Sequence, residues 1–173
     1  MRTGGFRVYR GQLAGGDRGT AQTLGIMRRL ARRGSREVEV RAAAIEALHR
    51  SGVRPHDHEG EVLALFRYVR DGIHFVNDVA GVETLQGPRA TMTLGGGDCD
   101  DKATLLAGLL RSIGIPSSFR VVAANRRAPG RFSHVYVVAH LPDGRSLPLD
   151  PTYQRTPAGW EIPHPYRMAE VPA

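Results

Sequence analysis

One segment near the middle of the chain constrains the fold more than any other, because a glycine run, a cysteine and a long apolar stretch follow one another there. The segment has the sequence TLGGGDCDDKATLLAGLLRSIGIP and spans residues 93–116. Its leucines recur at helical spacing, Gly114 is a typical helix stop, and Pro116 cannot continue a helix. We therefore predict a buried helix over residues 99–113, entered through a tight turn that glycines form easily.

The start of this helix has the features of an anion site. Asp98 is a favourable N-cap residue, and Asp101 matches the acidic position of a capping box. Cys99 then lies in the first turn, where unpaired N–H groups and the helix dipole stabilise a thiolate or, together with Gly97 and Asp98, an oxyanion. Asp100 and Asp101 complement the dipole, but they oppose a thiolate unless they point to solvent.

The remaining segments predict an α+β fold. We expect helices over residues 20–34, 35–52 and 57–72, a short strand over 73–76, an irregular stretch over 77–94, and strands over 117–125, 132–141 and 145–150. A run of helices followed by a run of strands is typical of helices packed on an antiparallel sheet. The predicted architecture is a helical N-terminal half packed on such a sheet, with Cys99 at the N-terminus of a core helix.

The length of 173 residues fits one domain. We expect an extended or flexible arm over residues 1–19 and a single domain over residues 20–173. Within that domain we distinguish a helical subregion over 20–72, a core over 73–153 that carries the candidate site, and a C-terminal tail over 154–173.

Composition narrows the functional classes. The single cysteine excludes an internal disulfide framework and fits a reducing compartment, and neither a secretory leader nor a membrane span is evident, so we expect a cytoplasmic protein. The net charge of +7 arises within residues 1–70. Arginines on solvated helix faces explain this charge as well as a nucleic-acid surface does, and because no nucleic-acid-binding motif is present we expect no nucleic-acid partner.

Two residues beyond the helix could complete a catalytic group with Cys99. His134 lies within a predicted strand, and Asp150 ends the next one. Residues 142–144 form the turn between them, and because paired positions in a hairpin sum to a nearly constant number, the carboxylate can reach the imidazole. A thiol nucleophile needs such a base and orienting group. Tyr136 shares the face of His134, and it is either a wall of the site or a core aromatic. The alternative for Cys99 is a buried, inert thiol.

The segment HDHEGE, residues 56–61, offers a second candidate cluster. His56, His58 and Glu59 are metal-binding residue types, but zinc ligands on one helix face usually lie four residues apart. Asp57 is explained more simply as a helix cap. We therefore predict no metal site and no cofactor.

The sequence GDCDDKATLLAGLLRSIGIPSSFRVVA, followed by SHVYVV and then PLDPTY, resembles the transglutaminase-like superfamily of papain-related thiol enzymes, in particular its small bacterial or phage-type members. The resemblance covers roughly residues 62–153. It implies that Cys99 is the nucleophile, His134 the general base and acid, and Asp150 the orienting carboxylate. A glutamine supplies an oxyanion donor in papain-like enzymes, and Gln86 is the candidate here. Tryptophans that the family often carries near the histidine and aspartate are missing, which leaves the second oxyanion donor open.

The resemblance also implies a reaction on amide bonds through a thioester, on a peptide or protein substrate and without a cofactor. We expect hydrolysis, as by a protease, peptidase or deamidase, rather than crosslinking, because a small open domain has little means of excluding water. The alternative is a non-catalytic binding or assembly module, virion-associated if phage-encoded, that uses the basic N-terminal helices. The substrate and the oligomeric state stay open.

Overall fold

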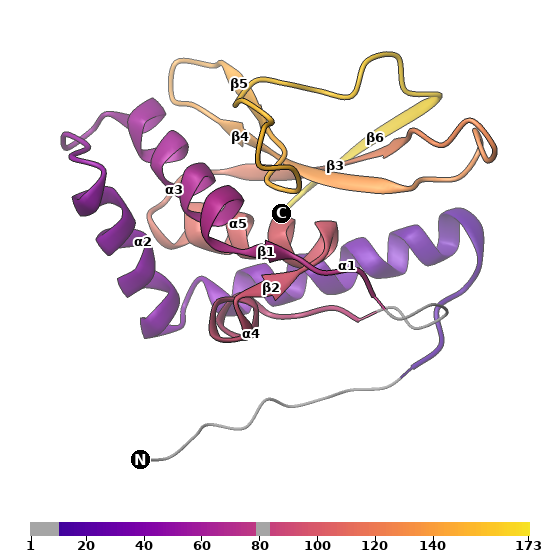
Figure 1. Cartoon of the computed structure of the whole chain (residues 1–173), viewed down its shortest axis with the longest axis horizontal. Coiled ribbons are helices and arrows are strands. Elements are labelled where there is room, and N and C mark those ends of the chain that lie inside the picture. The colour runs from indigo at the N-terminus through magenta and orange to yellow at the C-terminus, as the bar shows by residue number, and fades with distance from the viewer. Residues whose placement is uncertain (1–10, 79–83) are drawn as a thin grey trace.

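A central helix organises the structure, a computed structural model that describes residues 11–78 and 84–173 (Figure 1). This helix, α5 (Cys99–Ser112), is buried along most of its 14 residues. It contacts α1, α2, α3 and α4 as well as the sheet strands β3 and β4. The apolar stretch that follows the glycine run is therefore enclosed by other elements, as its leucines predict.

The predicted helices are present, with shifted ends. The helices around α5 are α1 (Gly16–Gly34), α2 (Val38–Arg50), α3 (His58–Gly72) and α4 (Pro88–Leu94). Asp57 caps α3, because its Oδ1 accepts the Gly60 N–H at 2.9 Å. None of the helices in the described ranges is long and apolar enough to cross a bilayer.

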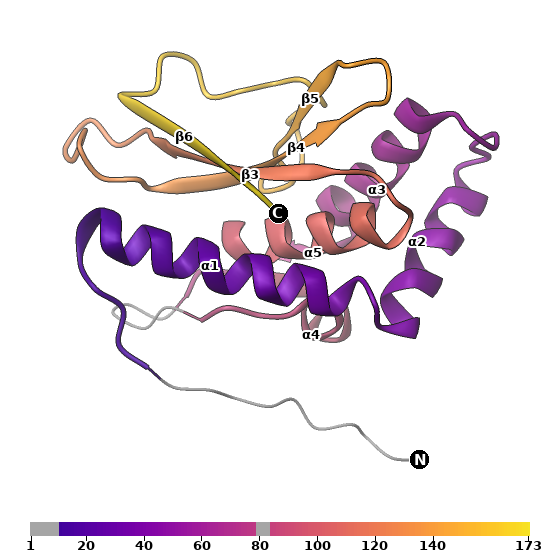
Figure 2. The same ribbon diagram turned by 180° about the vertical axis from the view of Figure 1, so that it is seen from behind.

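The predicted antiparallel sheet is confirmed, and with it the α+β fold. Its strands are β3 (Ser117–Ala123), β4 (His134–His140), β5 (Ser146–Leu149) and β6 (Arg167–Pro172), in the spatial order β5-β4-β3-β6. The helices cover one face of the sheet, and the chain between β5 and β6 crosses the opposite face (Figures 1 and 2). Ile162 of this crossing packs on Val122, Tyr136 and Val138.

Three predicted boundaries were wrong. Residues 16–19, assigned to the arm, already belong to α1, and Asp17 in its first turn pairs with Arg167 of β6 at 2.9 Å. The segment 154–173, assigned as a tail, ends in β6, which pairs antiparallel with β3. Part of the stretch 77–94, assigned as irregular, forms α4, which begins at a proline, a residue favoured in the first turn of a helix.

A two-stranded parallel ladder leads into the candidate site. β1 (His74–Phe75), which continues from the end of α3, pairs with β2 (Gly96–Gly97) directly before α5. Gly97 must be glycine there, because a Cβ at this position would lie 2.5 Å from the Cβ of Asp101. The ladder and the close packing fix where α5 begins.

Candidate active site

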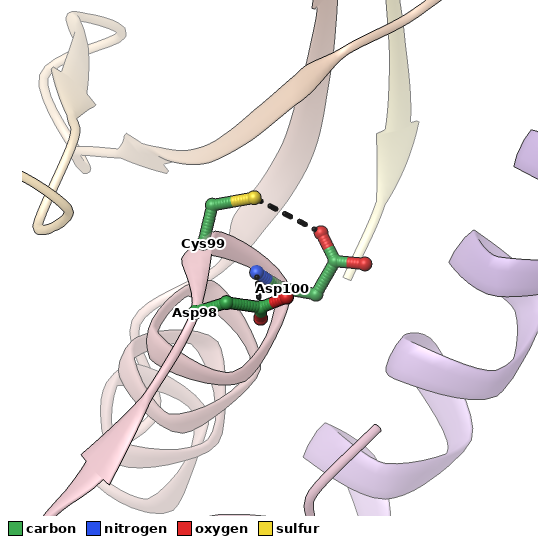
Figure 3. Close-up of side chains that lie close together, drawn as sticks. All are labelled: Asp98, Cys99 and Asp100. Atoms are coloured by element: carbon green, nitrogen blue, oxygen red, sulfur yellow. Dashed lines mark hydrogen bonds between the residues drawn. The ribbon is translucent and has the colours of Figure 1, made fainter. Parts of the chain in front are cut away.

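The side chain of Cys99 projects from the first turn of α5 toward the sheet (Figure 3). Asp98 is the N-cap, and its Oδ1 accepts the N–H groups of Asp100 at 3.0 Å and Asp101 at 3.2 Å. The Cys99 Sγ lies 3.4 Å from Oδ1 of Asp100, and the backbone N–H of Val135 in β4 donates to it. The predicted cap and the placement of the cysteine are thus found in the structure.

The electrostatic surroundings of the thiol differ from the expectation. Burial raises the pKa of the Cys99 thiol, and the carboxylates of Asp100 and Asp98 raise it further. Asp100 accepts a hydrogen bond from the thiol instead of pointing away to solvent. The helix dipole does not outweigh these effects, so at neutral pH the resting side chain is a protonated thiol and not a thiolate.

Replacing Asp100 with asparagine is expected to lower the pKa of the Cys99 thiol, because it removes the nearest negative charge. A fall of about one pKa unit raises the thiolate fraction near neutral pH about tenfold. Intact-mass measurement of iodoacetamide alkylation against pH reads this directly, since Cys99 is the only cysteine. Asp143→Asn, in an exposed turn, is the matched control, and a rate unchanged in Asp100→Asn would contradict the assignment.

His134 and Asp150 are brought together as the hairpin spacing predicts. In the register of β4 and β5, Val137 pairs with Leu149. His134 Nε2 donates to Asp150 Oδ2 at 2.8 Å, while Asp150 Oδ1 accepts the N–H of Thr152 at 3.0 Å. Burial alone would raise the pKa of Asp150, but the hydrogen bond and charge of His134 and the Thr152 N–H lower it. Asp150 is therefore an ionised carboxylate that orients His134 and leaves its Nδ1 available.

Two tyrosines flank the imidazole of His134. The Tyr153 ring stacks on it, with centroids 6.0 Å apart, and the Tyr136 ring lies 6.1 Å away. Tyr136 is 1% exposed, and its hydroxyl donates to Glu161 on the outer side of the sheet at 2.7 Å. Of the two roles left open for Tyr136, a wall of the site or a core aromatic, its burial and its bond to Glu161 favour the core aromatic, which lies beside His134. Tyr153, which is half exposed, was missed although it follows Asp150 in the segment DPTY.

Gln86 has a role other than the predicted oxyanion donor. Its backbone N–H donates to Asp101 Oδ1 and its Nε2 to Asp101 Oδ2, both at 2.7 Å, and Nε2 also lies 3.3 Å from the carbonyl of Gly96. The side-chain N–H groups are therefore directed at Asp101 and Gly96. Gln86 holds the segment before α4 against the start of α5.

Among the residues that the structure describes, the first turn of α5 leaves one backbone N–H group for an oxyanion. The cap carboxylate of Asp98 takes the N–H groups of Asp100 and Asp101. The N–H of Cys99 is the first in the helix and has no intrahelical acceptor. Asp98 and Gly97 were predicted as part of an oxyanion site. In the structure Asp98 caps the turn that presents this N–H, and Gly97 allows the close approach to Asp101.

Lys102, the only lysine of the chain, is buried one turn after Cys99. Its Nζ donates to the carbonyls of Ile73 at 2.7 Å and Arg70 at 3.4 Å, at the end of α3. Burial lowers the pKa of Lys102 to about 8, against the charges of Asp150 and Asp71, which raise it. A lone lysine within an apolar helix was the sequence feature that could have indicated this buried cation next to the catalytic candidates.

Metal-binding residue types gather at one place in the described ranges. One ligand atom each of Asp98, Cys99 and Asp100 lies within 4.8 Å of the others, so a hard cation could use the two carboxylates. In this structure these carboxylates cap the helix and accept from the thiol. In the segment HDHEGE, the second candidate cluster, His58 Nδ1 pairs with Glu61 at 3.0 Å, and Asp57 caps α3 as expected.

The backbone hydrogen bond that lowers the pKa of the Cys99 thiol comes from Val135, the residue after His134 in β4, and successive side chains of a strand point to opposite faces of the sheet. Within residues 11–78 and 84–173, however, no hydrogen bond joins the thiol to the imidazole; the thiol bonds to Asp100. Of the three predicted catalytic residues, the structure joins His134 and Asp150 directly, and Cys99 bonds to Asp100.

Two solved structures share this fold at low sequence identity, and this chain spans at most about half the length of either. A candidate cysteine protease from Cytophaga hutchinsonii is 18% identical with a TM-score of 0.50, over 78% of this chain and 51% of that one. A candidate protease from Parabacteroides distasonis is 15% identical with a TM-score of 0.53, over 73% of this chain and 26% of that one. Legionella pneumophila LapG is 16% identical with a TM-score of 0.46, over 76% of this chain and 74% of that one.

The family is established by sequence rather than by these structural likenesses, which show the fold alone. A search of curated proteins returned no match. The model of the transglutaminase-like superfamily matches residues 46–151, more than half of the chain, and this range includes Cys99, His134 and Asp150. The chain belongs to the transglutaminase-like superfamily.

Proposed function

We propose that the chain is a cysteine enzyme that cleaves amide bonds through a thioester, with Cys99, His134 and Asp150 as its catalytic residues. The observation that carries the proposal is the 2.8 Å bond between His134 Nε2 and Asp150, because it directs the basic Nδ1 away from the carboxylate. The effect of the Val135 backbone on the pKa of the thiol supports it, since Val135 follows His134 in β4.

A protonated resting thiol favours general-base activation over a preformed ion pair. The S–H turns from Asp100 to His134 Nδ1, which takes the proton as Sγ bonds to the carbonyl carbon. The oxyanion forms beside the Cys99 N–H. His134 then gives the proton to the departing amine as the C–N bond breaks, which leaves the thioester. Water attacks the thioester with His134 as base, and the thiol recovers its proton.

The test is acylation of the protein by a panel of p-nitrophenyl esters and peptide thioesters, followed by intact mass. We expect an adduct on Cys99 and a decrease of about 100-fold or more in its rate of formation in His134→Ala. Adding glycine methyl ester during turnover separates the two fates of the thioester. A free acid as the main product supports hydrolysis, and an amide product supports transfer. Equal acylation of wild type and His134→Ala would overturn the proposal.

A binding or assembly role is the second candidate, and two observations favour it. Burial and the Asp100 carboxylate raise the pKa of Cys99, which favours the protonated thiol at rest, and the arginines of α1 form no ion pairs in the described part of the chain. The acylation assay distinguishes the two functions, because a binding module would form no adduct on Cys99 that depends on His134.

A further inference from the structure

A hollow surface lies where the end of α1 meets the start of α2, and Figure 2 shows this junction of the two helices. We name it the α1–α2 surface. Its residues are Arg29, Arg32, Arg33, Ser35, Arg36, Glu37, Val38, Arg41, Ala42 and Ile45. The surface contains two hollows. Arg36 and Glu37 line both of them, so the hollows are continuous with each other.

The side of this surface on α2 is apolar and exposed. Val38 is 79% exposed and Ile45 is 52% exposed. With Ala42 between them they follow the spacing of one helix face, and they do not pack on the core. Exposed aliphatic side chains gathered in a hollow are typical of a site that another chain covers.

The side on α1 and the turn that follows it is strongly basic. Arg29, Arg32, Arg33 and Arg36 are exposed, and none of the four makes an ion pair with any residue in the described ranges. The acidic residues nearby are already paired, since Arg89 lies 4.0 Å from Glu37 and 3.5 Å from Glu39. The surface therefore presents uncompensated positive charge beside its apolar stripe.

The surface is joined to the helix that carries Cys99, but at its other end. Arg41 Nη1 donates to the carbonyl of Ser112, the last residue of α5, at 3.1 Å. Cys99 is the first of the 14 residues of α5. At a rise of 1.5 Å per residue, the two ends of α5 lie about 20 Å apart. A chain seated on the α1–α2 surface would leave the catalytic candidates uncovered.

We propose that the α1–α2 surface docks a segment of a partner protein that carries acidic side chains and a row of aliphatic ones. The arginines select the negative charge, and the Val38–Ile45 stripe selects the aliphatic row. A nucleic acid would leave the apolar stripe uncovered. A second copy of this chain, docked symmetrically, would bring the same arginines face to face. The docking is independent of catalysis, because Cys99 takes no part in it.

The test is selection of a displayed library of random 16-residue peptides on the full chain, followed by anisotropy titration of the enriched peptides. We expect enrichment of Asp and Glu together with Leu, Ile or Val at helical spacing. Arg32→Glu with Arg36→Glu, and separately Val38→Ser with Ile45→Ser, should each weaken binding about tenfold or more. Added salt should weaken it as well.

The control variants carry the same kinds of substitution at residues outside the α1–α2 surface. Arg126→Glu with Arg127→Glu in the exposed turn after β3, and Met168→Ser on β6, should leave binding unchanged, as should Cys99→Ser. Circular dichroism confirms that each variant is folded. The proposal is overturned if no acidic, aliphatic peptide is enriched, or if the controls weaken binding equally. Binding confined to single-stranded DNA or anionic vesicles, or dimerisation that Val38→Ser with Ile45→Ser abolishes, would also overturn it.

Discussion

Replacing Asp150 with asparagine is expected to slow the acylation of Cys99 by roughly 10³- to 10⁴-fold, as the loss of the correct imidazole tautomer does in serine triads. The Thr152 N–H donates to Oδ1 of Asp150, so the oxygen of an asparagine amide would stay at Thr152. The amide NH₂ would then face His134 Nε2 and force its proton onto Nδ1. The nitrogen that must take the thiol proton would already carry one.

Asp143→Asn provides the matched control, since it makes the same change in the exposed turn at the other end of the hairpin. It should acylate at the wild-type rate. A small effect of Asp150→Asn, less than about tenfold, would show that Asp150 holds the hairpin together without orienting the base. Thermal unfolding of both variants separates lost orientation from lost folding.

The sequence was sufficient to predict the helix of Cys99 and the pairing of His134 with Asp150. Both depend on local rules. A cap residue and a stop define the helix ends, and the short turn at residues 142–144 determines which positions of β4 and β5 are opposite. Where a short turn connects two neighbouring elements, the spacing of residues in the sequence predicts which of them lie close together in the structure.

The state of the thiol could not be predicted in this way. Whether Asp100 points to solvent or to Cys99 depends on the rotamer that the surrounding sheet and helices leave open, and the sequence of the turn is the same in both cases. The burial that raises the pKa of Cys99 comes from packing against other elements, and α5 contacts helices and strands both before and after it in the chain. Non-local packing therefore reverses what the helix dipole alone favours.

The final strand was missed for a related reason. The segment that becomes β6 is mostly exposed, so it lacks the alternation of buried and exposed residues by which a half-buried strand is identified. It is held by its pairing with β3 and by side chains from distant segments, as in the ion pair of Arg120 with Glu170 at 2.7 Å. An edge strand of this kind depends on the rest of the sheet being in place.

Asp101 is expected to make the stability of the chain fall as the pH rises from about 4 to 7. Burial raises its pKa from the ordinary 3.8 to about 7, against the hydrogen bonds from Gln86, which lower it. The native state therefore keeps a proton that the unfolded chain loses, so the stabilisation is complete below pH 3.8 and is lost by about pH 7. Three pKa units correspond to at most about 4 kcal/mol of unfolding free energy.

Asp101→Asn should remove this decline, because an amide does not ionise. If the Gln86 amide turns over, its Oε1, which is buried without a partner in the described structure, can accept from the new NH₂ group. Urea unfolding between pH 4 and 8 measures this. The wild type and Asp101→Asn should have similar free energies of unfolding at pH 4, and the variant should become increasingly more stable than the wild type toward pH 8. Asp57→Asn, which keeps a good helix cap, should follow the wild type. If the free energy of unfolding of Asp101→Asn falls with pH as steeply as that of the wild type, the pH dependence belongs to other groups, since the histidines and the remaining carboxylates are the same in both proteins.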